Sequence, residues 1–261
     1  MSPIPHRQAG QHFLVTGAGT GIGRAIATRL AAEGAVVSLS GRRRAPLEAV
    51  AAEIEAAAGK ARAVPADIRD AASLHKAIRS SVGAFGPLRG VIANAGVGGP
   101  NEPGPDDRFA DLVQTNLVGT YQTLRAAQPH LAAGPASRHL VVVASILGRI
   151  GVPGYTGYCA SKSGLFGLVR ALAHELAAEG VRVNAVAPGW VETEMAWEGI
   201  DGMAESMGIT REQAHAMAME AVPTGRMSQP AHIAGLIAWL VSDDAAGVTG
   251  QGLDMNNGAW M

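Results

Sequence analysis

Short runs rich in β-branched residues alternate with longer runs rich in Ala and Leu along almost the whole chain. Runs of about four to eight apolar residues are typical of strands, and longer runs with apolar residues three and four apart are typical of helices. The pattern predicts strands at 12–16, 35–40, 61–66, 89–94, 138–145, 181–186 and 250–255. Between them it predicts helices at 22–33, 45–58, 71–84, 108–132, 158–179 and 230–241.

Strands that alternate with helices predict an α/β fold, in which helices cover both faces of a doubly wound parallel sheet of about seven strands. Apolar runs such as the one at 138–145 suit strands that are buried on both sides. No linker-like change of composition divides the chain, so we expect one domain over residues 1–261. We expect residues 1–10 to be a loose lead-in.

The alternation stops at residues 190–229, which hold six of the nine Met residues and two of the four Trp residues. This segment follows the sixth strand, and an insertion there can cover the carboxyl edge of the sheet. We expect it to be a substrate lid with an apolar pocket, although some of its large side chains could instead pack the lid onto the body. The candidate lining residues are Trp190, Met195, Trp197, Met203 and Met207.

Composition narrows the classes of function. The 261 residues carry a formal net charge of −1, which argues against a binder of nucleic acid or of anionic membranes. A hydrophobic content of 48% argues against disorder. The single Cys excludes an internal disulfide and suits a reducing, cytoplasmic location. We find no targeting segment and no apolar run long enough to span a bilayer.

A glycine-rich loop, Thr16-Gly17-Ala18-Gly19-Thr20-Gly21-Ile22-Gly23, follows the first predicted strand and opens the first predicted helix. Such a loop lets backbone N–H groups approach a pyrophosphate, and the helix N-terminus adds partial positive charge. A glycine pattern alone is weak, but the strand–loop–helix context supports it. The loop predicts a dinucleotide site with contacts from Gly17, Thr20, Gly21, Ile22 and Gly23.

The end of the second predicted strand indicates which dinucleotide binds. Sites that prefer NAD usually place a carboxylate there for the ribose hydroxyls. This chain instead reads Ser40-Gly41-Arg42-Arg43-Arg44, with no acidic residue before Glu48. A guanidinium would hold a 2′-phosphate that a carboxylate would repel. The sequence therefore favours NADP(H) over NAD(H), with Arg42 and then Arg43 as phosphate contacts.

Tyr158 and Lys162 are four residues apart and share a helix face, and Ser145 ends a buried strand at the edge where such sheets bind ligands. An ammonium beside the phenol, together with a positive nicotinamide, would lower the phenol pKa. Tyr158 could then exchange a proton with an alcohol or ketone oxygen while Ser145 holds that oxygen. The eight His residues show no metal-ligand spacing, and we expect no metal.

With these motifs the chain resembles the short-chain dehydrogenase/reductase superfamily, in its compact single-domain branch with a Rossmann-type sheet. The resemblance runs from about residue 11 to the C-terminus and includes the loop at 16–23, the set Ser145, Tyr158 and Lys162, and the Asn-Ala-Gly motif at 94–96, where Ala93 replaces a first Asn. It implies that Asn116 is catalytic through a water path and that Lys162 also holds the nicotinamide ribose. It further implies cofactor contacts from Asp67, Ile68, Asn94, Ala95, Gly96, Pro188, Gly189, Val191 and Thr193.

The implied function is an NAD(P)(H)-dependent oxidoreductase that interconverts a secondary alcohol and a ketone, similar to 3-oxoacyl-thioester reductases and ketoreductases. The resemblance also implies a homotetramer that uses the helix at 158–179 and the last strand as interfaces. The apolar stripe Leu165, Leu168, Val169, Leu172 and Leu176 would equally fit ordinary core packing. The alternative is a non-catalytic nucleotide sensor or scaffold. A hydrolase is disfavoured because Ser145 lacks the flanking glycines of a nucleophile elbow.

Overall fold

Seven parallel strands form one sheet in the order β3-β2-β1-β4-β5-β6-β7. The computed structural model describes residues 2–134 and 136–261. The order reverses between β1 and β4, so the ends of these two strands open a crevice at the carboxyl edge. The strands are β1 (His12–Thr16), β2 (Val36–Ser40), β3 (Lys60–Ala63), β4 (Gly90–Ala93), β5 (Arg138–Val143), β6 (Val181–Pro188) and β7 (Gly252–Met255).

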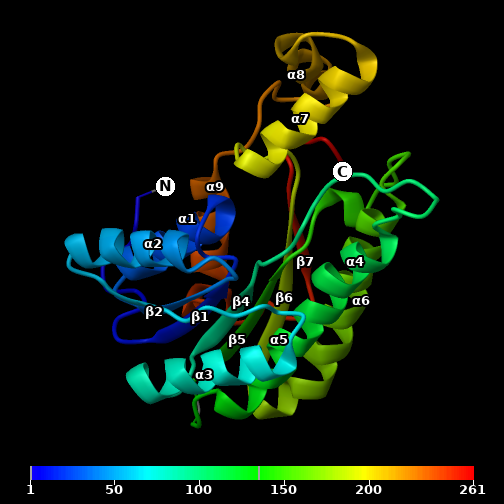
Figure 1. Ribbon diagram of the computed structural model, residues 1–261. Helices are drawn as coiled ribbons and strands as arrows, with labels where there is room; N and C mark the ends of the chain where they lie inside the picture. The colour runs from blue at the N-terminus through cyan, green and yellow to red at the C-terminus, as the bar shows by residue number, and fades with distance from the viewer. Residues whose placement is uncertain (1, 135) are drawn as a thin grey trace.

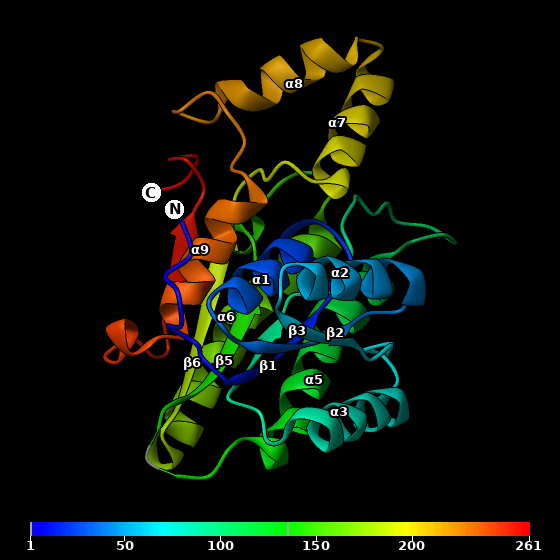
Figure 2. The ribbon, with the colours of Figure 1, turned by 90° about the vertical axis from the view of Figure 1, so that its left-hand side faces the viewer.

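Helices cover both faces of the sheet (Figure 1; Figure 2). One face packs against α1 (Gly21–Ala32), α2 (Arg44–Ala56) and α9 (Pro230–Leu240) around a core that includes Phe13, Val37 and Ile92. The other packs against α3 (Ala71–Phe85), α5 (Gly119–Ala127) and α6 (Thr156–Leu176). The apolar stripe of α6 lies in this second core, so it is core packing. The predicted doubly wound sheet of seven strands is confirmed.

The prediction of a single helix at 108–132 is wrong, because the structure divides this range into four helical segments. They are α4 (Phe109–Val113), the π-helical turn η1 (Gln114–Val118), α5 and the 3-10 turn η2 (Gln128–His130). In η1 the Asn116 amide bonds the backbone of Val97, which favours a widened turn. In η2 Pro129 has no N–H to continue the helix.

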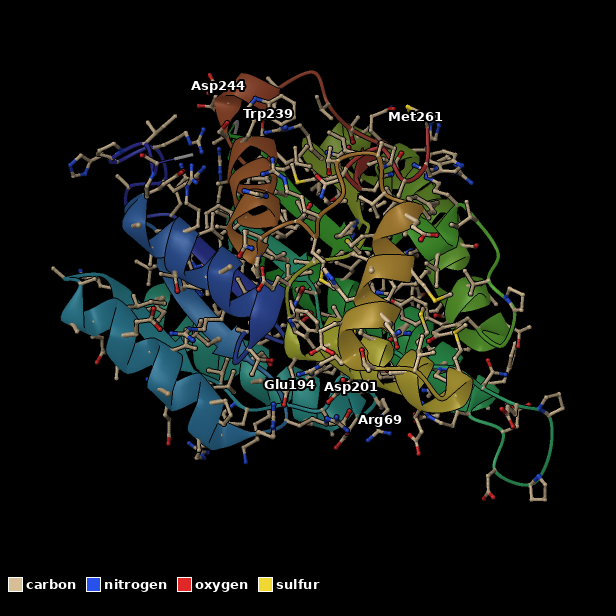
Figure 3. All side chains as sticks on the ribbon, turned by 90° about the horizontal axis from the view of Figure 1, so that it is seen from above. Arg69, Glu194, Asp201, Trp239, Asp244 and Met261 are labelled. Atoms are coloured by element: carbon tan, nitrogen blue, oxygen red, sulfur yellow. The ribbon has the colours of Figure 1, made fainter. Side chains whose placement is uncertain are left out.

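The lid at 190–229 contains two further helices, α7 (Glu194–Met207) and α8 (Arg211–Glu220). Gly208, at φ +64°, ends α7, and a capping box of Thr210 and Gln213 begins α8. The two helices bury their own small apolar cluster, with Ile200 and Ala214 fully buried. They stand above the carboxyl edge of the sheet in Figure 1, and Figure 3 looks down on them from above.

The lead-in at 1–10 was expected to be loose, and its described part is instead attached to the body. Arg7 Nε lies 2.8 Å from Glu33 Oε2, and Arg29 Nε lies 2.6 Å from Glu33 Oε1. The Glu33 side chain is fully buried. Burial raises the pKa of this carboxyl, but hydrogen bonds from Arg7 and Arg29 outweigh burial and lower it. A buried carboxylate between two guanidinium groups therefore holds the lead-in against α1.

We expect Glu33→Ala to lower the free energy of unfolding by about 3–5 kcal/mol, because it leaves buried arginine charge without its partner. The matched control is Glu53→Ala, since the pair between Arg24 and Glu53 is exposed and its loss should cost less than about 1 kcal/mol. Urea denaturation measures both. The folded pKa of Glu33 is lowered, so its stabilisation is present above the unfolded pKa and is lost as the pH falls. Equal effects of the two substitutions at neutral pH would contradict the account.

Candidate active site

The crevice begins where β1 and β4 end side by side. Thr16 Oγ1 accepts hydrogen bonds from the backbone N–H groups of Asn94 (3.1 Å) and Ala95 (3.0 Å). Asn94 Nδ2 in return donates to the carbonyls of Thr16 (3.0 Å) and Gly17 (3.3 Å). These bonds join the glycine-rich loop to the Asn-Ala-Gly motif, so the structure brings these two predicted segments together.

Three glycines of the loop have no room for a side chain, and a Cβ on one of them, Gly19, would lie 2.9 Å from Pro46 Cβ. A Cβ on Gly17, which has φ +63°, would lie 2.8 Å from Asn94 Nδ2. A Cβ on Gly23 would lie 2.1 Å from the carbonyl oxygen of Gly17. Thr20 is the N-cap of α1, and no side-chain bond from it caps the first turn within the described residues. The first N–H groups of α1, beginning at Gly21 and Ile22, therefore receive no side-chain cap from Thr20.

A cavity of about 130 Å³ lies beside the loop, between the ends of β2, β3 and β4. It brings together six predicted cofactor residues: Gly17, Arg42, Asp67, Ile68, Ala95 and Gly96. It also adds residues that the sequence did not single out as contacts: Gly41, Ala66, Arg69, Val97 and Thr115.

Among the added residues, Arg69 forms ion pairs with two carboxylates. Its Nη2 lies 2.8 Å from Asp67 Oδ2, and its Nη1 lies 3.2 Å from Asp111 Oδ1. Hydrogen bonds from Arg69 hold the pKa of Asp67 below its usual value. The only signal for this pair in the sequence is the spacing of two residues between Asp67 and Arg69, which is common in surface turns.

The three arginines that follow β2 differ in their partners. Arg44 Nη1 lies 3.2 Å from Glu48 Oε1. Among residues 2–134 and 136–261, neither Arg42 nor Arg43 has an ion pair, and both are exposed. Arg42 lines the cavity, whereas Arg43 is the N-cap of α2. Of these two arginines only Arg42 lines the cavity, and its contact with a phosphate stays a prediction.

Ser145 and Tyr158 meet on the far side of the crevice. Ser145 follows β5 and is the N-cap of the 3-10 turn η3 (Ile146–Gly148), where its Oγ accepts a hydrogen bond from the N–H of Leu147 at 3.1 Å. Tyr158 lies in the first turn of α6. Burial raises the pKa of the Tyr158 phenol, and a hydrogen bond with Ser145 opposes this rise.

Lys162 lies one turn further along α6. Its Nζ donates to the Val143 carbonyl at 3.0 Å and lies 5.6 Å from the centre of the Tyr158 ring. Burial lowers the pKa of Lys162 to about 8. Burial outweighs the hydrogen bond at the phenol, and the lowering of the Tyr158 pKa that we expect from the ammonium and a bound nicotinamide together stays a prediction. The two groups are close, but each is shifted towards its neutral form.

Asn116 joins this group from the π-helical turn. Its Oδ1 accepts from the N–H of Val97 at 2.8 Å, and its Nδ2 donates to Val97 O (3.0 Å) and to Ser161 Oγ (3.1 Å). A Cβ on Gly96 would lie 2.9 Å from Asn116 Oδ1 and 3.6 Å from Lys162 Nζ. Asn116, Lys162 and the Asn-Ala-Gly motif therefore converge at Gly96.

The segment after β6 closes the crevice opposite α1. Gly189 donates its N–H to Met255 O at 3.2 Å and has no room for a Cβ, which would lie 3.0 Å from Asn256 Cα. Val191 is buried next to the strand end formed by Pro188. Thr193 is the N-cap of α7, and its methyl group would lie 3.2 Å from a Cβ on Gly21. Of the predicted residues of this segment, Thr193 thus lies against the glycine-rich loop, at Gly21.

Comparison with known proteins identifies the family. A family model described as enoyl-(acyl carrier protein) reductase matches residues 17–259. The chain belongs to the short-chain dehydrogenase/reductase family. It is 34% identical to a 3-oxoacyl-(acyl-carrier-protein) reductase of Staphylococcus aureus over 252 residues, which cover 95% of this chain and 97% of the relative. The predicted resemblance is confirmed.

Solved structures of the short-chain dehydrogenase/reductase family share the whole fold. A variant of actinorhodin polyketide ketoreductase with NADPH superposes with a TM-score of 0.88 at 33% identity and covers 98% of this chain and 99% of its own. A short-chain dehydrogenase from Burkholderia cenocepacia in complex with NADP gives a TM-score of 0.85 at 31% identity, covering 97% and 99%. The chain is therefore placed in a family of oxidoreductases by both sequence and fold.

The lid only partly matches the expected pocket. Met195 is 47% exposed, and its Sδ would lie 3.1 Å from a Cβ on Gly98 at the rim of the crevice. Trp190, Trp197 and Met203 instead pack against the apolar cluster of the lid, and Trp197 stacks on His215 at 5.3 Å. The lid needs these side chains for its own core, because its two helices bury little apolar surface elsewhere.

The described residues give no sign of a metal site or a membrane span. Within 2–134 and 136–261, no group of three or more His, Cys, Asp or Glu residues is placed to hold a metal ion. None of the helices in that part of the chain is long and apolar enough to cross a bilayer.

Proposed function

We propose that this member of the short-chain dehydrogenase/reductase family interconverts a secondary alcohol and a ketone with NADP(H). The observation that carries this proposal is the contact of Tyr158 with Ser145, one helical turn from Lys162, in the crevice behind the glycine-rich loop. The relatives support it, since they include a 3-oxoacyl-(acyl-carrier-protein) reductase and a ketoreductase structure with NADPH. They give no support to a non-catalytic sensor or scaffold.

The residues of the crevice fit NADP(H). The first N–H groups of α1 would hold the pyrophosphate, Asp67 and Ile68 would hold the adenine, and Arg42 would offer its guanidinium to the 2′-phosphate. Gly96 has no room for a Cβ, which would lie 2.9 Å from Asn116 Oδ1, and Lys162 beside it would hold the ribose. When bound, the nicotinamide of the cofactor supplies or accepts the hydride.

The side chains of this chain would handle the proton and the substrate oxygen. Ser145 donates a hydrogen bond to the carbonyl oxygen and stabilises the charge that develops there during reduction. Tyr158 gives its phenolic proton to the forming alkoxide, and burial, which raises the pKa of the phenol, favours the protonated form before that step. Asn116, bonded to Ser161 of α6 and to the Val97 backbone, would organise the path that returns the proton.

The rim of the crevice supports a hydrophobic or 3-oxoacyl-type substrate. Met195 is exposed above it, and Leu147, Val152 and Tyr155 are half-buried beside Ser145 and Tyr158. These side chains offer apolar surface and no charge. A carbonyl compound with an apolar or acyl chain therefore suits the rim better than a charged sugar.

We further propose a homotetramer in the cytoplasm. Phe109 and Tyr121 are large apolar side chains on α4 and α5 that stay 42% and 44% exposed, which suits a face between copies. A Cβ on Gly167 of α6 would meet no described atom within 4 Å, so this position leaves room for a partner helix. The single Cys supports a reducing compartment.

Tyr158→Phe should abolish most of the ketone reduction and leave nucleotide binding intact. The change removes only the phenolic hydroxyl, so we expect kcat to fall by about 10²–10⁴-fold. NADPH oxidation with a panel of ketones and 3-oxoacyl thioesters measures the rate, and a fluorescence titration measures the Kd of NADPH. A variant that reduces ketones at the wild-type rate would remove Tyr158 from the reaction.

Arg42→Ala should weaken NADPH binding about ten- to hundredfold and leave NADH binding unchanged, because a charge-assisted bond to the 2′-phosphate is worth about 1.5–3 kcal/mol. Arg44→Ala is the matched control, since Arg44 is paired with Glu48 at 3.2 Å. Titrations of the three proteins with both nucleotides give the comparison. Equal losses for NADPH and NADH would contradict a phosphate contact at Arg42.

A further inference from the structure

Asn101 is a buried side chain that none of the steps above uses. It lies in the loop that joins β4 to α4, and only 6% of its surface is exposed. Its backbone N–H donates to the Gly154 carbonyl at 2.8 Å. Its side-chain amide makes hydrogen bonds in two opposite directions, towards the start of α6 and towards the start of α4.

The first turn of α6 takes its cap from Asn101. Within the described residues, the N-cap residue Tyr155 makes no side-chain bond to this turn. Asn101 Oδ1 instead accepts the N–H of Gly157 at 2.8 Å, across 56 positions of sequence, and Thr156 Oγ1 lies 3.0 Å from Asn101 Nδ2 and 3.2 Å from Asn101 Oδ1. Gly157 immediately precedes Tyr158. A buried N–H without an acceptor would cost free energy, so this bond fixes the turn that carries Tyr158.

The same amide holds the start of α4. Asn101 Nδ2 donates to Asp107 Oδ1 at 3.0 Å, and the same oxygen accepts the N–H of Phe109 at 2.9 Å. A Cβ on Gly157 would lie 2.9 Å from Phe109 Cα, so the two helix starts are in direct contact. Because α4 runs directly into the turn that holds Asn116, one amide links the helices that carry Tyr158, Lys162 and Asn116.

We propose that Asn101 is a positioning residue that sets the place of the Tyr158 hydroxyl against Ser145 by locking the first turn of α6 to the start of α4. This inference rests on the proposed reduction of a ketone with Tyr158 as proton donor. A shift of about 1 Å in a reacting group can lower the rate about a hundredfold. Loss of the hydrogen bond from Gly157, one residue before Tyr158, can therefore lower kcat although Asn101 does not touch the substrate.

The reciprocal arrangement of amide and carboxylate permits a matched set of variants. N101A removes both bonds. N101D keeps an oxygen for the N–H of Gly157 but sets a second carboxylate against Asp107. The exchange variant N101D/D107N restores one amide and one carboxylate, keeps the net charge, and can rebuild the bonds to Gly157 and to Phe109 in swapped form.

We expect N101A and N101D to lower kcat about ten- to hundredfold, with the Kd of NADPH within about threefold of wild type. The exchange variant should recover kcat to within about threefold of wild type. Amide hydrogen exchange of residues 155–162, measured without substrate, should quicken in N101A and recover in the exchange variant. Thermal unfolding shows whether each variant is folded at the assay temperature. If N101A is unfolded, the test is the comparison of kcat between N101D/D107N and N101D.

Three results separate failure of this inference from failure of the proposed function. A wild-type protein that reduces ketones beside a folded N101A variant with unchanged kcat overturns the positioning role alone. An exchange variant that folds but remains as slow as N101D overturns it too. A wild-type protein that binds NADPH and reduces no ketone contradicts the proposed function, and this inference with it.

Discussion

The hydrogen bonds between Thr16 and Asn94 hold the ends of β1 and β4 together. The crevice depends on them, because the strand order reverses between these two strands. Thr16 precedes the glycine-rich loop, and Asn94 precedes Ala95 and Gly96. The approach is so close that neither Gly17 nor Gly23 can carry a Cβ. From this junction the loop leads to the uncapped start of α1, and Gly96 leads to Asn116 and Lys162. The nucleotide end and the chemical end of the site therefore share one anchor.

Burial sets the protonation of the chemical end. It raises the pKa of Tyr158 and lowers that of Lys162 to about 8, so the surroundings favour the neutral form of both groups. From sequence we expected the lysine and a positive nicotinamide together to lower the phenol pKa. Burial acts in the opposite direction and favours the protonated phenol, which is the form that donates to an alkoxide.

The sequence could predict the elements and residues that follow simple periods. The alternation of short strand-like runs with longer helix-like runs located the seven strands, and the spacing of four residues placed Tyr158 and Lys162 on one helix face. The break at Asn116 could not be predicted, because hydrophobic periodicity does not reveal one extra residue in a helical turn. The attachment of Arg7 to Glu33 also depends on tertiary contact between distant positions. The same is true of Asn101, whose partner at Gly157 is remote in sequence. The lid was predicted as an insertion, but its helices depend on a local apolar core.

Hydride transfer is followed most directly with NADPH carrying deuterium at C4 of the nicotinamide. The protein is mixed with this nucleotide and a hydrophobic 3-oxoacyl thioester or ketone, and the alcohol is analysed by mass spectrometry and NMR. Our account predicts one deuterium on the carbinol carbon, from one face of the nicotinamide only. Unlabelled alcohol from NADPH deuterated on either face of C4, or a protein that binds the nucleotide yet forms no alcohol from any ketone tested, would contradict it.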